Sequence, residues 1–376
     1  MGRNANGKSG LPRRRTKTIH LGGLGLGSEH PVRVQSMTNT DTRDVEPTLA
    51  QVDRLIEAGC EIVRLAVPDE QAARSLARIK AARPLVPLIA DIHFDHRLAL
   101  LAIEAGIDGL RINPGNIGSK QAVDRVADAA RSHAVPIRIG ANSGSVDKDL
   151  LHRYGGPKPE ALVESALRHV RLLESRGHAD IKISLKSSSV LPTLEAYRKL
   201  AAHVDYPFHI GITEAGTPIR GSVKSGVGLG LLLHEGLGDT VRVSLTGDPV
   251  DEVLVAWEIL RSLELRQRGP NIVSCPTCGR TEIDLLGLAA DVEEYLRPVT
   301  HVFTVAVMGC PVNGPGEAKE ADIGIAGGKD CGLIFKKGAI VRKVRGSAHL
   351  FAEFKRDLAI FLSELDKQGS EATPCE

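Results

Sequence analysis

The feature that most constrains the fold is a pattern repeated eight times between residues 31 and 266. Each repeat has a short β-branched run ending in a polar or charged residue, a turn rich in Gly, Pro or Asn, and a helical pattern. The runs cover 31–38, 61–68, 87–94, 109–116, 136–144, 181–188, 207–216 and 241–249, with amphipathic stretches such as 46–58 and 159–176 between them. Eight βα units of roughly 22–45 residues predict a TIM-type (β/α)8 barrel. A doubly wound open sheet is the structural alternative, but it rarely sustains eight such regular units.

A second, smaller domain is expected after the barrel. Residues 267–271 (Gln-Arg-Gly-Pro-Asn) are typical of a linker. Beyond them, strand-like runs at 302–308, 323–326, 333–335 and 339–344 alternate with helical patterns at 284–296 and 348–367, which predicts an α+β domain. The expected organisation is a disordered basic N-terminus at 1–17, a barrel at 18–266, a linker at 267–271 and the α+β domain at 272–376.

Composition narrows the class of protein. Hydrophobic residues make up 42% and charged residues 25% of the 376, which is typical of a soluble globular protein. The longest apolar runs fall short of the roughly 18 residues that a membrane span needs. A net charge of +2 and 3% aromatic residues argue against a nucleic-acid partner. Six cysteines without a secretory leader favour a cytoplasmic protein without disulfides.

The first seventeen residues are basic, and no acid precedes Glu29. Such a tail could touch nucleic acid or a membrane, or serve as a targeting peptide. Its scattered Gly, Asn and Pro residues and its lack of an amphipathic period favour disorder instead.

Polar residues recur at alternate positions near the ends of the eight runs, so that each set shares one face of its strand. Because polar side chains are costly in the middle of a barrel, we expect them to crowd its C-terminal mouth. Five cations from five strands would then need a strongly anionic guest such as a di- or polyphosphate. The alternative is a stabilising network with Asp91, Glu214 and other acids, but strand-end carboxylates are too few to neutralise all five. The cations are Arg64, Arg111, Arg138, Lys186 and Arg242.

Three cysteines form a candidate metal site in the second domain. Cys275 and Cys278 are spaced C-x2-C, and Cys310 follows on a loop stiffened by Gly and Pro. Three thiolates can occupy three corners of a tetrahedron, and Glu317 could fill the fourth at rest. A structural zinc site is the alternative, although zinc ribbons usually supply a second C-x2-C or a Cys/His pair. No role is expected for the remaining cysteines, which are Cys60, Cys331 and Cys375.

Six motifs, in order through both domains, carry a family resemblance. They are Val-Gln-Ser-Met-Thr-Asn-Thr at 34–40, Ala-Asp-Ile-His-Phe at 90–94, Arg-Ile-Asn-Pro-Gly-Asn at 111–116, Thr-Glu-Ala-Gly at 213–216, and the cysteine segments 274–280 and 308–318. Together, over roughly residues 15–360, they resemble the bacterial 4-hydroxy-3-methylbut-2-enyl diphosphate synthases of the non-mevalonate isoprenoid route. The resemblance implies a TIM-type barrel followed by a small α+β iron–sulfur domain.

The resemblance also implies a chemistry. A [4Fe–4S] cluster would be held by the three cysteines, with Glu317 on its fourth iron at rest. The enzyme would carry out the two-electron reductive dehydration and ring opening of 2-C-methyl-D-erythritol 2,4-cyclodiphosphate, with Glu214 as the candidate proton donor. Reduced flavodoxin or ferredoxin would supply electrons, and a head-to-tail homodimer would bring cluster and barrel together. The expected substrate-binding residues are Arg64, Asp91, His93, Arg111, Asn113, Arg138, Asn142, Lys186, Arg242 and Ser244.

Two other functions remain open at this stage. One is a non-redox, phosphate-binding barrel enzyme that resembles pteroate synthases and carries a structural zinc. The other is a nucleic-acid-binding zinc module, which the charge and the aromatic content disfavour.

Overall fold

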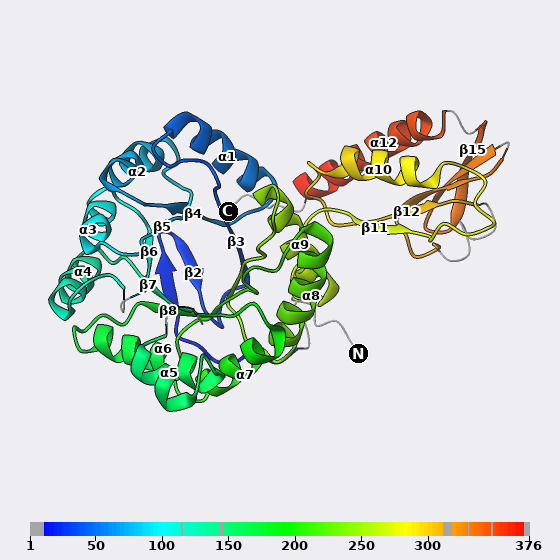
Figure 1. The fold of residues 1–376 in the computed structure, drawn as a ribbon. Helices are drawn as coiled ribbons and strands as arrows, with labels where there is room; N and C mark the ends of the chain where they lie inside the picture. The colour runs from blue at the N-terminus through cyan, green and yellow to red at the C-terminus, as the bar shows by residue number, and fades with distance from the viewer. Residues whose placement is uncertain are drawn as a thin grey trace. The chain divides into compact units, whose positions relative to one another are not determined.

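The computed structural model describes residues 11–113, 116–142, 144, 146–310, 318–329, 331–346 and 349–371. The chain divides into two compact units, residues 1–266 and 267–376 (Figure 1). Among the described helices, none is both long enough and apolar enough to cross a membrane.

The first unit is a barrel of eight parallel strands, hydrogen-bonded in the order β8-β7-β6-β5-β4-β3-β10-β9. A parallel bridge between Ile183 and Phe208 joins the two ends of this sheet, so the barrel is nearly closed. The strands are β3 (Arg33–Met37), β4 (Ile62–Ala66), β5 (Leu88–Asp91), β6 (Gly109–Ile112), β7 (Ile137–Asn142), β8 (Ile181–Lys186), β9 (His209–Ile210) and β10 (Thr240–Val241). Each overlaps one of the eight predicted runs, and the predicted (β/α)8 barrel is confirmed.

Helices ring these strands, as Figure 1 shows. Their bounds are α1 (Val45–Glu57), α2 (Glu70–Ala82), α3 (His96–Glu104), α4 (Lys120–Ser132), α5 (Lys148–Tyr154), α6 (Pro159–Glu174), α7 (Val190–Ala201), α8 (Pro218–His234) and α9 (Pro249–Ser262). Several begin at a side chain that accepts a backbone N–H of the first turn, as Asp69 does for α2 and Ser119 for α4. Such caps help to fix where each strand-to-helix turn ends.

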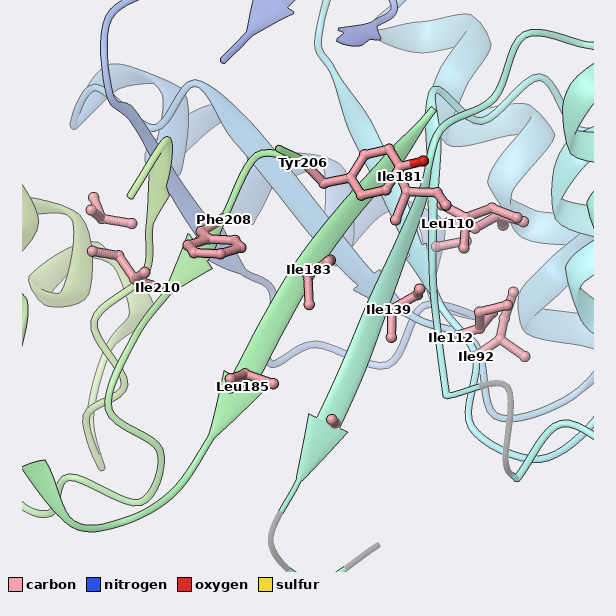
Figure 2. Packing of buried hydrophobic residues seen from close by; sticks show 14 of the residues in the cluster. Ile92, Leu110, Ile112, Ile139, Ile181, Ile183, Leu185, Tyr206, Phe208 and Ile210 are labelled. Atoms are coloured by element: carbon pink, nitrogen blue, oxygen red, sulfur yellow. The ribbon is translucent and has the colours of Figure 1, made fainter. Parts of the chain in front are cut away.

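The main core lies between strands and helices, because alternate strand residues point outward. Ile139 of β7 and Ile183 and Leu185 of β8 belong to this layer, together with Phe208 and Ile210 (Figure 2). The residues between them point into the barrel. Two antiparallel strands, β1 (Ile19–Leu21) and β2 (Leu24–Leu26), close the barrel's N-terminal end by packing apolar side chains on the starts of β4 and β5.

The expectation of a disordered N-terminus is wrong for residues 11–17, and residues 1–10 lie outside the described part of the chain. Arg13 pairs with the buried Asp239 at 2.8 Å. Arg14 donates to backbone carbonyls at Val204 and Tyr206, and its guanidinium lies 3.8 Å from the centre of the Phe208 ring. These basic residues therefore bind the N-terminal end of the barrel, and composition alone does not reveal these contacts.

The second unit is a five-stranded sheet in the order β11-β12-β13-β14-β15. The strands are β11 (Asn271–Ser274), β12 (Thr304–Met308), β13 (Ile323–Gly327), β14 (Cys331–Lys336) and β15 (Ala339–Arg345). The first three are parallel, and the last two are antiparallel additions. Helices α10 (Leu285–Leu296) and α12 (Leu350–Glu371) share one apolar core with the sheet. The sequence did not predict β11, whose first residue falls in the segment expected to be a linker.

Candidate functional site

The barrel interior above the β1–β2 hairpin is polar. Cα pairing places Asp91 of β5 opposite Arg111 of β6, and Arg111 opposite Arg138 of β7. Arg138 is in turn paired with Lys182 of β8. Because paired residues of neighbouring strands point to the same side of a sheet, these four side chains stand in one row along the inner wall.

Asp91 is the buried acid that organises this row. Its Oδ1 accepts a hydrogen bond from Arg111 Nη1 at 3.1 Å, and its Oδ2 lies 3.5 Å from Arg64 Nε. The same Arg111 nitrogen lies 2.9 Å from His93 Nε2. Burial opposes ionisation of Asp91, but the charges of Arg64 and Arg111 and the hydrogen bond with His93 outweigh it and hold the pKa well below its ordinary value. Asp91 is therefore an anion that orients two arginines and an imidazole.

Arg138 has no such partner among the described residues. Arg138 is 1% exposed, and none of its three guanidinium nitrogens has a hydrogen-bond partner among the described residues. Burial, and the charges of all four predicted arginines, lower the pKa of Lys186 well below its ordinary value. The structure thus brings the five predicted cations into one interior region. Their binding of a diphosphate remains a prediction.

Arg242 lies one residue beyond the end of β10, and Ser244 follows two residues later. Arg242 Nη2 lies 3.4 Å from Glu252 of α9, a buried acid that the sequence analysis did not single out. Glu252 also accepts hydrogen bonds from the Ser36 hydroxyl at 2.9 Å and the Leu245 N–H at 3.0 Å. This carboxylate is therefore a fixed part of the wall, and its long contact leaves Arg242 able to reach a ligand.

The remaining predicted binding residues of the barrel include both buried and exposed side chains. Asn113 is buried one residue beyond β6, and Asn142 is paired with Lys186 at the ends of β7 and β8. His93 is exposed. Glu214 is exposed beyond β9, and its φ of +52° is unusual for a residue other than glycine. Such backbone conformations are concentrated at functional sites.

Polar residues reach deeper than the sequence analysis expected. Lys182, at 3% exposure, and His209, at 2%, lie inside the barrel with Arg138 and not only at its mouth. Both polar atoms of the Gln35 side-chain amide, its oxygen and its nitrogen, are also buried without a partner among the described residues. Lys182 and Lys186 lie on the same face of β8, and this pattern could have predicted the deeper polar site. It was not used in that way, because polar side chains were expected only at the mouth of the barrel.

In the second unit, two cysteine-bearing segments meet at one edge of the sheet. Strands β11 and β12 are parallel, with Ser274 opposite Val307, so their C-terminal extensions run side by side. The Gly309 N–H donates a hydrogen bond to Cys275 Sγ at 3.2 Å. A Cβ at Gly309 would lie 3.0 Å from Thr281 and 3.1 Å from Leu285, so this close approach favours glycine. Cys275 and the residue preceding Cys310 are thus in direct contact.

These thiols fit an iron–sulfur centre in their chemistry. Hydrogen bonds from Arg280 lower the pKa of Cys278 and favour the thiolate that binds metal. The N–H···S bond to Cys275 is of the kind that surrounds such clusters. No group of three His, Cys, Asp or Glu residues suited to a single metal ion occurs in the part of the chain that the structure describes. Glu317 lies outside the described residues.

Comparison with known proteins adds an independent line. Residues 16–257 match the family model described as the GcpE TIM-barrel domain, and residues 271–359 match the GcpE protein C-terminal domain. A relative from Maridesulfovibrio salexigens is 65% identical over 354 residues, covering 94% of this chain and 99% of the relative. One from Nitratidesulfovibrio vulgaris is 62% identical over 353 residues, covering 94% and 91%. Both are named 4-hydroxy-3-methylbut-2-en-1-yl diphosphate synthase (flavodoxin).

Among solved structures, the Yersinia pestis dihydropteroate synthase in a sulfonamide drug complex aligns with a TM-score of 0.50 at 14% identity. The alignment covers 66% of this chain and 98% of that one. At this identity the similarity concerns the barrel fold alone.

Proposed function

This chain belongs to the GcpE family, and we propose that it is an iron–sulfur oxidoreductase acting on 2-C-methyl-D-erythritol 2,4-cyclodiphosphate. The reaction is a two-electron reductive dehydration with ring opening, and its product is (E)-4-hydroxy-3-methylbut-2-enyl diphosphate. The observation that carries the proposal is the excess of buried positive charge in the barrel. Five cations converge there, while Asp91 and Glu252 are the buried acids paired with them among the described residues.

A bound diphosphate accounts for this excess. Arg138 offers three buried nitrogens without partners among the described residues, and the amine of Lys186 lies at the end of β8. Arg111 is already oriented by Asp91 and needs no rearrangement to bind an anion. Charge-assisted hydrogen bonds to phosphate oxygens would satisfy these donors and offset their mutual repulsion.

The second unit supplies the redox centre in this proposal. Cys275, Cys278 and Cys310 hold a [4Fe–4S] cluster, and Glu317 completes its ligands at rest. When bound, such a cluster delivers electrons singly and offers a Lewis-acidic iron. The C3 oxygen of the substrate leaves as water and needs a proton, which Glu214, exposed at the barrel mouth, donates.

The partners follow from the same assignment. Flavodoxin, which the names of the relatives include, is the proposed electron donor, with ferredoxin as the alternative. A homodimer is proposed as the active form, and light scattering of the full-length protein measures it.

The test is anaerobic purification with iron and sulfide analysis, followed by turnover of the cyclic diphosphate with reduced flavodoxin. Arg138→Met and Lys186→Met should each raise KM about ten- to a hundred-fold, because a charge-assisted hydrogen bond contributes ~1.5–3 kcal/mol. Their iron content should be unchanged. Lys199→Met is the control, because Lys199 pairs with Glu160 at 2.9 Å on the outer helices. Unaltered substrate affinity in both variants would place the diphosphate elsewhere, and zinc in place of iron would support the non-redox enzyme.

A further inference from the structure

Lys182 is a sixth basic residue inside the barrel, and the proposed function gives it no role. We propose that Lys182 is a proton-coupled positioning residue of the diphosphate site: an uncharged amine in the empty barrel that takes up a proton from solvent when the diphosphate binds. The inference rests on the proposed function for the identity of the ligand. It goes further by assigning a residue and a proton to the binding step.

Lys182 lies close to two residues of the proposed diphosphate site, Arg138 and Lys186. It lies on the inward face of β8, four residues before Lys186, and is paired with Arg138 across the β7–β8 ladder. Between the two lysines, Ser184 donates its hydroxyl to the Ile139 carbonyl at 3.3 Å, so that hydroxyl is bound to the barrel wall. Lys182 Nζ is buried and has no hydrogen-bond partner among the described residues. An unpartnered amine thus lies beside an unpartnered guanidinium.

The titratable and charged groups that face Lys182 come from four other parts of the barrel. They are Arg64 of β4, Arg138 of β7, His209 of β9 and Asp239 just before β10.

Asp239 is the acid in this group, but its carboxylate is already engaged. It accepts hydrogen bonds from Arg13 at 2.8 Å, from the Thr16 hydroxyl at 3.2 Å and from the Phe208 N–H at 2.8 Å. Asp91 is likewise held by Arg111 and Arg64. A charged Lys182 would therefore sit among cations in the empty barrel without an acid of its own.

These surroundings act on the protonation of Lys182. Burial, and then the charge of Arg138, lower its pKa to about 7. His209 stays neutral, because burial and the charges of Arg138 and Arg64 hold its pKa well below the ordinary value. Its Nδ1 lies 2.8 Å from the Thr240 hydroxyl. Lys182 is thus an interior group that can change charge near neutral pH.

Binding of a diphosphate reverses the balance. The anion adds negative charge close to Arg138 and Lys186 and so raises the pKa of Lys182. One N–H bond forms with a proton from solvent, and no electron is transferred. Because the bound state holds the extra proton, affinity strengthens as the pH falls toward about 7, the pKa of the free amine, and levels off below it. The empty barrel avoids a sixth buried charge, and the occupied barrel gains one more attraction.

Isothermal titration calorimetry of the full-length, anaerobically purified protein tests this. The cyclic diphosphate, whose diester-type groups do not titrate in this range, is added at pH 8 in HEPES and in Tris, which differ in ionisation enthalpy. An amine with a pKa of about 7 is about nine-tenths neutral at pH 8, so wild type should take up nearly one proton per diphosphate. Lys182→Met should lose that uptake and bind about ten-fold more weakly at pH 7. Lys199→Met should behave as wild type.

Each outcome of these titrations either supports or overturns the inference. Equal proton uptake in wild type and Lys182→Met would assign the proton to another group, such as Lys186, and overturn the inference alone. Failure of wild type to bind the cyclic diphosphate would overturn the proposed function with it. Lys182→Gln is the second variant, and the fluorescence of Trp257 shows whether each barrel is folded. If both variants unfold, the wild-type affinity between pH 9 and 7 decides, because the inference requires it to strengthen over that interval.

Discussion

Replacing Asp91 by Asn tests whether one buried carboxylate holds the cation cluster together. Asp91 is 5% exposed and lies 3.1 Å from Arg111 and 3.5 Å from Arg64, both of which are also buried. Asparagine keeps the shape but removes the charge, and it leaves two guanidinium groups without their anion. Removing one partner of a buried ion pair costs about 3–5 kcal/mol, so the free energy of unfolding of the barrel should fall by about that amount.

The assay is urea unfolding followed by tryptophan fluorescence. Trp257 is the single tryptophan of the chain, and its indole N–H donates to the Gly59 carbonyl at 3.0 Å, so its signal reports on the barrel unit. Asp53→Asn is the matched control. Asp53 pairs with Arg83 at 2.6 Å where both side chains are partly exposed, and its loss should cost less than about 1 kcal/mol.

The pH dependence gives a second measure of the same effect. The folded-state pKa of Asp91 is held well below the value of about 3.9 expected in the unfolded chain. Its contribution to stability is therefore fully present above about pH 4 and is lost as the pH falls toward the folded-state pKa. The difference between wild type and Asp91→Asn should shrink below pH 4. A loss no larger than that of Asp53→Asn at pH 7 would refute the organising role of Asp91.

Serine at each predicted cluster ligand should abolish iron binding and turnover, whereas serine at each other cysteine should preserve both; an intact cluster in the first set would move the ligand assignment. The first set is Cys275, Cys278 and Cys310, and the second is Cys60, Cys331 and Cys375. Glu317→Ala should keep most of its iron but show an altered visible spectrum and slower turnover, because carboxylate binds iron more weakly than thiolate does. A variant with the wild-type spectrum and rate would instead favour a helix-capping role. Arg13→Ala should lower the unfolding free energy of the barrel by about 2–4 kcal/mol, since it leaves Asp239 buried without its cation, while the exposed Arg15→Ala should change it by less than about 0.5 kcal/mol.

Some of the second unit could be read from the sequence and some could not. The strands of its centre were predictable, because their apolar runs are buried. Strand β11 is largely exposed, lies at the sheet edge and contains Asn271 and Ser274, so it carries little hydrophobic signal. Its pairing with β12 is nevertheless what brings Cys275 to the Gly309 N–H. A C-x2-C spacing shows that two thiols share a turn, but not which loop they meet.

The sequence by itself determined the barrel and the face on which its cations lie. Eight repeats of strand and helix admit few other folds, and the period of two along a strand sends Arg111, Arg138 and Lys186 to one side of the sheet. Which charges are neutralised was decided only by the tertiary structure. Asp91 serves Arg111 and Arg64, and Asp239 is held by Arg13 from the N-terminal segment. Pairing depends on distances of a few ångströms between residues far apart in the chain, so Lys182 was left without an acid by contacts that no local pattern records.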